Sequence, residues 1–368
     1  MRNHIKTLSL DEIIEMTPAE LIAGLERGAL SLYKLFRADR ARLIQRVIED
    51  PRTAPRRIVS YIVWTLGHAA MKYVVGPLCR FILWCVFLGD KGSGDEAYWR
   101  MKRAKLVRVV RFLFPDQVRG EPPAQTPAQT SGEDGRGLIV GFNHPTLHEV
   151  FGLISWSLNR FPDRINNFPT NLPWYESICT CAPLMKKVGV HITPLITQSS
   201  FKKLERIHWG DEKMIGYIQK VREMLLIHYF NIAISYERSG DNTFSAPSAM
   251  RQVTIFPKSA ASYSDPDAER LLPAMSGLMY KIIRANKDRK PTALFLPVTV
   301  VPPKLRVRRL RGLKLFRRFS LIVGKGFSMD EARTLGRGFD YAFLMRLTEN
   351  APEELWYPKA APHLLPHR

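Results

Sequence analysis

The feature that most constrains this 368-residue chain is a short apolar run, residues 138–140, enclosed by Gly137 and Gly141. An apolar run this short between two glycines predicts a buried β-strand, because a helix needs a longer stretch. In open α/β sheets, ligands bind beyond the carboxyl ends of the strands. The strand is therefore expected to deliver His144 to the mouth of a sheet.

His144 has a candidate partner in Glu149, five residues further on. If a helix begins after Pro145, as proline at a first helical turn favours, Glu149 folds back towards the imidazole. A carboxylate that holds an imidazole in one tautomer makes it a better general base towards a hydroxyl. The alternative is that His144 caps a turn and that Glu149 is a solvated helix residue.

Asn143, His144 and the acid five residues later resemble the first motif of the glycerolipid (lysophospholipid) acyltransferase family, in which that acid is an aspartate. Glu149 departs from the pattern by one methylene. The resemblance implies that His144 removes the proton of an acceptor hydroxyl while Glu149 orients the ring, and that Asn143 contacts substrate. No covalent acyl-enzyme is implied. The second imidazole, His148, is expected on the helix surface or the pocket wall.

Residues 186–194 resemble the second motif of this family, and Gly189 matches its glycine as a substrate-binding position. Thr193 and Pro194 stand where the family has an acid and an arginine. The resemblance implies that this arginine holds the phosphate of the acceptor. Its absence argues for an acceptor other than a simple glycerol phosphate, such as a lyso-aminolipid.

Two segments resemble the third motif. The first, residues 231–240, is expected to follow a helix at 211–228 and to form an apolar strand that ends in Glu237 and Arg238, with Gly240 behind them. On this interpretation Glu237 shapes the pocket, Arg238 binds an anion, and Gly240 belongs to the same substrate-binding turn. The alternative is an exposed turn with an incidental ion pair.

The second candidate, residues 253–262, keeps a Phe-Pro pair and a final serine, but Lys258 replaces the glutamate. We favour the first candidate, because it retains the charged groups that the chemistry would use.

Residues 292–303 predict an apolar strand with an internal proline, similar to the Val-Pro-Val strand of the family. Residues 272–280 resemble a glycine-containing helix, and residues 321–328 resemble a closing strand and turn. The resemblance therefore implies an α/β domain at residues 137–350, in which helices flank a mixed central sheet.

The net charge of +21, from 55 Lys+Arg against 34 Asp+Glu, predicts an anionic partner. Anionic membrane lipids, an acidic acyl carrier protein and coenzyme A all fit. No recognisable nucleic-acid-binding motif occurs, so no nucleic acid is expected. The four cysteines are too few for a disulfide framework, and Cys179 and Cys181 lack a second metal-binding pair. The start of the chain has no long apolar segment, which favours a cytoplasmic location.

Residues 1–55 predict a separate helical region, with a capped helix start at Thr17 and Pro18. Residues 56–116 predict membrane-associating helices. The apolar stretch 58–88 is interrupted too often to span a bilayer cleanly, and two short helices that meet at Gly76–Pro77 would suit a hairpin in one leaflet or in the interface. A buried helix pair is the alternative.

Residues 98–114 predict an interfacial helix, because an apolar stripe is flanked by arginines and Trp99 lies near its start. Residues 304–318 carry eight basic residues and no acid, and suit a lipid surface, an acyl carrier protein or coenzyme A. Residues 117–136 predict a linker, and residues 351–368 a tail.

Together these features predict a membrane-surface acyltransferase of phospholipid biosynthesis. The resemblance implies transfer of a fatty acyl group from acyl-CoA or acyl carrier protein to a hydroxyl of a lyso-lipid or related lipid acceptor, with no metal or cofactor. The expected location is the cytoplasmic face of a membrane, peripheral or monotopic. The alternatives are an inactive lipid-binding protein and a basic nucleic-acid-binding protein.

Overall fold

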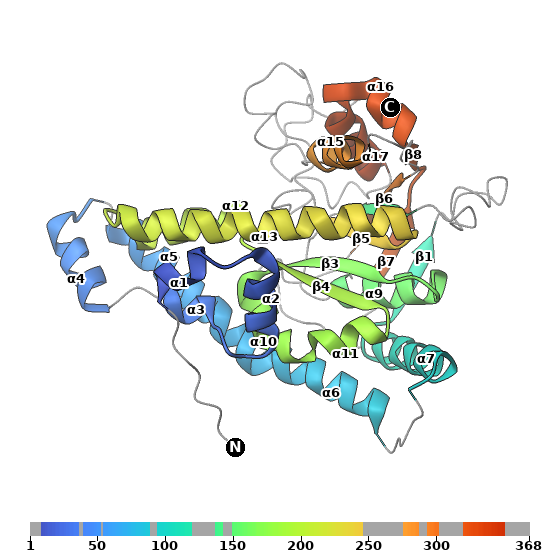
Figure 1. Cartoon of the computed structure of the whole chain (residues 1–368), viewed down its shortest axis with the longest axis horizontal. Helices are drawn as coiled ribbons and strands as arrows, with labels where there is room; N and C mark the ends of the chain where they lie inside the picture. The colour runs from blue at the N-terminus through green and yellow to red at the C-terminus, as the bar shows by residue number, and fades with distance from the viewer. Residues whose placement is uncertain are drawn as a thin grey trace. The chain divides into compact units, whose positions relative to one another are not determined.

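The computed structural model describes residues 9–36, 40–52, 54–88, 94–119, 137–142, 149–245, 275–286, 293–301 and 319–349. The fold is α/β, with a mixed sheet and flanking helices, as the sequence predicted (Figure 1). The chain divides into two compact units. Unit 1 comprises Met1–Cys85, Pro169–Lys187 and His191–Asn231, and unit 2 comprises Val86–Phe168, Val188–Val190 and Ile232–Arg368. The units interleave along the chain, and the consecutive segments predicted from composition remain predictions.

Unit 1 is largely helical, and local sequence fixes where its first helices begin. Ser9 with Glu12 and Thr17 with Glu20 form capping boxes, in which each hydroxyl and each carboxylate accepts a backbone N–H of the other residue. The helix start predicted at Thr17–Pro18 is therefore confirmed. The helices that lie wholly or mostly in this unit are α1 (Leu10–Ile14), α2 (Pro18–Glu26), α3 (Leu32–Leu35), α4 (Arg40–Glu49), α5 (Ala54–Ala70), η1 (Met71–Val75), α6 (Gly76–Phe87), α10 (Leu172–Ile178), η2 (Cys179–Cys181), α11 (Ala182–Lys187), α12 (Gln198–Ile207) and α13 (Glu212–Ser239). The last residues of α6 and of α13 belong to unit 2.

The hairpin predicted at Gly76–Pro77 does not form. Helix α5, the π-helical turn η1 and α6 follow one another without a break from Ala54 to Phe87. Proline in a helix lacks an N–H and crowds the preceding turn. A wide π turn directly before Pro77 gives the chain room to continue as a helix.

Within the described residues, the sheet has eight strands in the order β1-β7-β6-β2-β5-β3-β4, and β8 pairs with β6. β2 runs parallel to both of its neighbours, β5 and β6, whereas β7 and β8 run antiparallel to β6. The strands are β1 (Asp116–Arg119), β2 (Leu138–Phe142), β3 (Asn166–Asn171), β4 (Val190–Leu195), β5 (Asn242–Ser245), β6 (Leu294–Val301), β7 (Phe319–Val323) and β8 (Phe327–Ser328).

Helices α7 (Glu96–Leu113) and α9 (Glu149–Arg160) cover one face of the sheet in unit 2. Trp156 of α9 packs edge-on against Phe244 of β5, and Phe244 also packs near Phe142 of β2. The apolar stripe of α7 contacts α9 and is buried: Leu106 is 4% exposed and Val110 is 2% exposed. The prediction that this stripe faces lipid is therefore wrong, because a helix of the same unit covers it.

Helices α15 (Met275–Ala285) and α17 (Phe339–Glu349) cover the opposite face of β2, and α16 (Met329–Leu335) packs beside them. The side chain of Phe343 from α17 fills the space above Gly141, so that a Cβ at this glycine would lie 2.4 Å from the ring. Side chains of neighbouring strand residues point to opposite faces, and therefore Phe142 lies on the α9 side.

Adding one methyl group at Gly141 tests this close approach. Gly141→Ala is expected to lower the free energy of unfolding by about 1–3 kcal/mol, because the Phe343 ring has to move out of a packed core. Urea denaturation measures the change. Gly277→Ala is the matched control, since nothing lies within 4 Å of its Cβ position on α15, and alanine is the better helix former. Equal stability of Gly141→Ala and the wild type would contradict the packing.

Candidate functional site

The strand before the histidine motif and the helix after it are both present. β2 ends at Phe142 and α9 begins at Glu149, which confirms the predicted strand and the helix that follows. Asn143, His144 and His148 lie outside the described residues, as does the side chain of Glu149. The contact between His144 and Glu149 therefore stays a prediction.

Parallel pairing places the carboxyl end of β2, which directly precedes this motif in the chain, at a defined edge of the sheet. Val140 of β2 pairs with Phe244 of β5, and Phe142 pairs with Val298 of β6. Because these three strands run in the same direction, their carboxyl ends meet at one edge, which is where ligands bind in open α/β sheets. We call this the carboxyl edge. The chain segments that follow β2, β5 and β6 all leave from it.

β6 corresponds to the apolar strand predicted at residues 292–303 and extends from Leu294 to Val301. Its internal Pro297 pairs with Gly141, and the Pro297 carbonyl accepts a hydrogen bond from the Gly324 amide at 2.8 Å. Proline cannot donate to a ladder. The neighbouring strands therefore keep their register here by other bonds.

The strand predicted at residues 231–236 is wrong. Helix α13, drawn as a long yellow helix in Figure 1, continues through this segment to Ser239, and β5 begins only at Asn242. Tyr229, Ala233 and Tyr236 are buried at spacings of four and three residues, which is the period of a helix and not of a strand.

Glu237, Arg238 and Gly240 consequently precede β5 and do not follow a strand. The register pairs Ile139 with Thr243, so this segment lies beside the beginning of β2. That is the amino edge of the sheet, opposite the carboxyl edge. The structure thus does not bring these three residues together with the position that follows Phe142.

Glu237 and Arg238 form hydrogen bonds within the fold at the amino edge. The Asn286 side chain donates to the Glu237 carboxylate at 3.2 Å, and Glu237 is 3% exposed. Arg238 donates through Nε to the Asn286 side chain at 2.9 Å and through a second nitrogen to the Ala285 carbonyl at 2.6 Å. A basic side chain on the last carbonyls of a helix satisfies orphan acceptors. These residues join the ends of α13 and α15.

Gly189 also lies at the amino edge. Its φ of +88° is a conformation that favours glycine, and a Cβ would lie 2.8 Å from Nε of Arg103. The Gly189 carbonyl accepts the Asn166 amide at 2.9 Å at the start of β3. The turn that Gly189 makes aligns β3 and β4.

A polar cluster that the sequence did not reveal fixes this amino edge. The Asn242 side chain donates to the Asn166 side chain at 2.9 Å and accepts the Leu138 amide at 3.3 Å. Asp241 accepts the Ile165 amide at 2.8 Å, and Arg164, whose pKa burial lowers, donates to Asn242 at 3.4 Å. The cluster joins the starts of β2, β5 and β3, which sets the register that carries the chain to the carboxyl edge.

One long helical segment exposes an apolar surface. Among the described residues, Ala54–Phe87 is apolar and long enough to cross a membrane. An 18-residue window within it has a mean hydropathy of 1.5, and 35% of that window is buried. Its buried side contacts α12 and α10 within unit 1. The apolar stripe of α5–α6 consists of side chains that are 40–70% exposed: Ile58, Val59, Ile62, Val63, Leu66, Tyr73, Val74, Phe81 and Trp84.

No metal centre is evident within the described part of the chain, where no group of three or more His, Cys, Asp or Glu side chains could hold an ion. His191 and His228 are imidazoles of unit 1 that lie at least partly buried. Burial lowers the pKa of His191 to about 3, with Lys186 and His228 adding to the effect, and burial also lowers the pKa of His228. Both rings are therefore neutral at pH 7.

No family model matches the chain, and no curated protein matches it. Among solved structures, the chain is similar to the crystal structure of the 1-acyl-sn-glycerophosphate (LPA) acyltransferase, PlsC, from Thermotoga maritima. The match has 13% sequence identity and a TM-score of 0.31, and covers 82% of this chain and 99% of that chain. A TM-score this low carries no argument about residues or substrate.

Protonation of His191 is expected to destabilise the fold at acid pH. The folded-state pKa lies below the value of about 6.5 in an unfolded chain, so the unfolded state binds the proton first. The free energy of unfolding should therefore decrease as the pH falls below about 6.5, and continue to decrease towards pH 3. Urea denaturation at pH 7.5, 6.0 and 5.0 measures this slope, which His191→Gln should make shallower. A variant with the wild-type slope would show that His191 does not contribute.

Proposed function

We propose that this protein is an acyltransferase that works at a membrane surface. It would move a fatty acyl group from acyl-CoA or acyl carrier protein to a hydroxyl of a lyso-lipid or related lipid. The observation that carries the proposal is the placement of the motif between β2 and α9. The strand ends at Phe142 between two parallel neighbours, and the next helix begins at Glu149. In the chain, His144 belongs to the segment that follows the carboxyl end of β2.

The proposed reaction uses one general base. The imidazole of His144 accepts the proton of the acceptor hydroxyl as its oxygen bonds to the thioester carbonyl carbon. The carbon–sulfur bond then breaks, and the thiolate leaves and takes up the proton from the imidazolium. Glu149 holds the ring in position throughout. A positioned general base contributes about 10²–10⁴-fold to the rate.

The substrate contacts proposed from the sequence need revision. Asn143 keeps its proposed role, because it follows β2 directly at the carboxyl edge. Gly189, Glu237, Arg238 and Gly240 lie at the amino edge, where the two glycines have a positive φ and the two charged residues have structural partners. The proposed reaction therefore does not depend on these four residues.

Two other segments are better placed in the chain to contact the donor and the acceptor. Residues 253–262, the second candidate for the third motif, come after the carboxyl end of β5 at Ser245. The basic run at residues 304–318 comes after the carboxyl end of β6 at Val301. Both segments lie outside the described residues. We propose that their cationic side chains bind the phosphates of coenzyme A or the acidic surface of an acyl carrier protein.

The apolar stripe of α5–α6 supports the membrane location. A helix of 34 residues is about 50 Å long at 1.5 Å per residue, which exceeds the roughly 30 Å of a bilayer core. Its other side packs against α12 and α10, so lipid cannot surround it. We therefore propose that it lies along the membrane surface, with anionic lipids attracted by the net charge of +21.

A lipid-binding protein without catalysis is the second candidate. The observation that favours it is the position of Arg238, which removes the one intact charged pair of the third motif from the carboxyl edge.

An acyl transfer assay distinguishes the proposed enzyme from a lipid-binding protein without catalysis. Wild-type protein with a labelled acyl thioester and a panel of lyso-lipids is expected to form acylated lipid, and His144→Ala should lower the rate about 10²–10⁴-fold. His148→Ala, four residues further on, is the matched control and should stay within a few-fold of wild type. Unfolding curves of the three proteins exclude a folding defect. If the wild type consumes no thioester, or if His144→Ala keeps the wild-type rate, the proposed reaction is wrong.

Membrane binding can be tested separately by flotation with anionic liposomes. The double change Ile62→Glu and Leu66→Glu should weaken binding about tenfold, because two exposed apolar side chains lose contact with lipid. Leu335→Glu is the matched control, since Leu335 is 41% exposed and Ile62 is 45% exposed. A wild type that fails to float, or a double variant that floats equally well, would contradict the location.

A further inference from the structure

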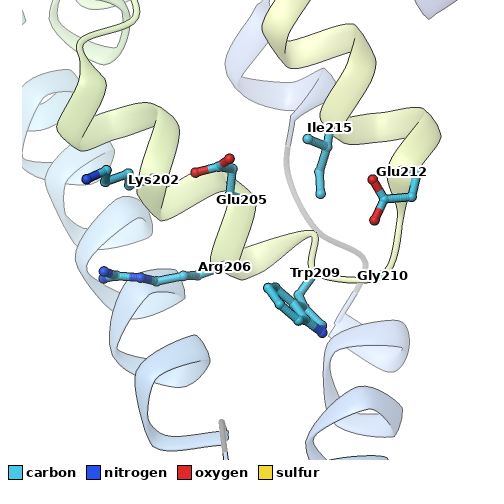
Figure 2. Close-up of a pocket in the computed structure, with 7 residues that line it drawn as sticks. All are labelled: Lys202, Glu205, Arg206, Trp209, Gly210, Glu212 and Ile215. Carbon is cyan, nitrogen blue, oxygen red and sulfur yellow. The ribbon is translucent and has the colours of Figure 1, made fainter.

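The turn between α12 and α13 encloses a hollow that the proposed reaction does not use (Figure 2). Its volume is about 650 Å³. Gly210 makes the turn with a φ of +80°, and nothing lies within 4 Å of its Cβ position. The lining belongs entirely to unit 1: Lys202, Glu205, Arg206, Trp209, Gly210, Glu212 and Ile215.

The hollow carries both signs of charge. In Figure 2, Lys202 and Arg206 extend to one side of α12, Glu212 lies on the side of α13, and Glu205 lies between them. Lys202 and Arg206 are one helical turn apart and therefore share a face. Within the part of the chain that the structure describes, none of these four charged side chains forms an ion pair. Two cations and two carboxylates thus remain available to a ligand.

Trp209 contributes an exposed aromatic surface. Trp209 is 61% exposed, so much of its indole is accessible to a ligand. The Arg57 guanidinium lies 5.9 Å from the ring centroid, and Arg57 is itself 4% exposed and paired with Asp50 at 3.2 Å. An indole beside carboxylates is the kind of surface that receives a quaternary or primary ammonium.

We propose that this hollow binds the headgroup of a zwitterionic phospholipid, with a phosphodiester at Lys202 and Arg206 and an ammonium at Glu212 and Trp209. A simple anion would leave the carboxylates repelling it, and a simple cation would meet two like charges. A headgroup with both charges satisfies the two sides of the hollow at once. The site would orient the protein on lipid, and it shares no residue with the histidine motif.

The neighbouring helix indicates that the ligand is a membrane lipid and not a free phosphodiester. Helix α5 packs against α12, and Arg57 of α5 contacts Trp209. The residues that follow Arg57, including Ile58, Val59 and Ile62, begin the apolar stripe of α5–α6. Acyl chains attached to a headgroup in the hollow would have this stripe beside them. The inference rests on the membrane location in the proposed function.

Soluble probes test the charge pattern with the full chain. Isothermal titration with glycerophosphocholine, inorganic phosphate and choline should show that glycerophosphocholine binds at least tenfold more tightly than either fragment. The affinity for glycerophosphocholine should be at least fivefold weaker in each of three variants: Arg206→Gln, Glu212→Gln and Trp209→Ala. Trp209→Phe, which keeps an aromatic ring, should weaken it less than Trp209→Ala. Lys220→Gln is the control, because this exposed cation of α13 does not line the hollow.

The hollow would be a general anion site, and the proposal would be overturned, if two results were found together. Phosphate would bind as tightly as glycerophosphocholine, and Glu212→Gln would leave the affinity for glycerophosphocholine unchanged. Absence of glycerophosphocholine binding at 20 mM would overturn the proposal as well. A second experiment measures binding to phosphatidylcholine vesicles. Trp209→Ala should bind these vesicles several-fold more weakly than the wild type does. If the same variant binds these vesicles as the wild type does, the lipid assignment is wrong.

The binding experiments with glycerophosphocholine can succeed or fail independently of the acyl transfer assay. His144→Ala should retain the full affinity for glycerophosphocholine. A wild type that binds glycerophosphocholine but transfers no acyl group would support the headgroup site and reject the proposed reaction.

Discussion

Parallel hydrogen bonding of β2 to β5 on one side and to β6 on the other is the constraint on which the rest of unit 2 depends. It brings three carboxyl ends to one edge and three amino ends to the other. Asn242 secures the amino ends, because one side chain bonds both the Leu138 amide and Asn166. Gly141 admits Phe343 and so lets α17 lie directly on β2. This register also fixes the point after Phe142 at which the segment that contains His144 leaves the sheet.

The two edges of the sheet divide the motif residues by role. The amino edge holds Gly189, Glu237 and Arg238 in turns and caps, where their hydrogen bonds stabilise the fold. The carboxyl edge is left to segments that follow β2, β5 and β6 in the chain. Net positive charge in the segment after β6 suits a donor that carries phosphates or an acidic carrier. In the proposed reaction, chemistry and structural support thus use opposite ends of the same strands.

We propose that unit 1 has two complementary surfaces for lipid. The apolar stripe of α5–α6 suits acyl chains, because its side chains lie exposed on one side of a helix that protein covers on the other. The hollow at the α12–α13 turn suits a headgroup, because its charges are separated and unpaired within the described chain. Helix α7 has a similar amphipathic sequence, but α9 covers its apolar side. Amphipathicity alone therefore did not show which helix leaves an apolar side exposed.

The sequence by itself determined the α/β class, the strands at Leu138–Phe142 and Leu294–Val301, and the capped start at Thr17, because glycine boundaries, apolar runs and capping side chains act within a few residues. It also located the histidine motif between a strand and a helix. Only the tertiary structure decided that α13 continues to Ser239, that Ala54–Phe87 is one helix, and which edge receives Arg238. The sequence of an apolar run or a charged pair does not specify which distant residues it will contact. Strand order and packing between residues far apart in the chain decide those contacts.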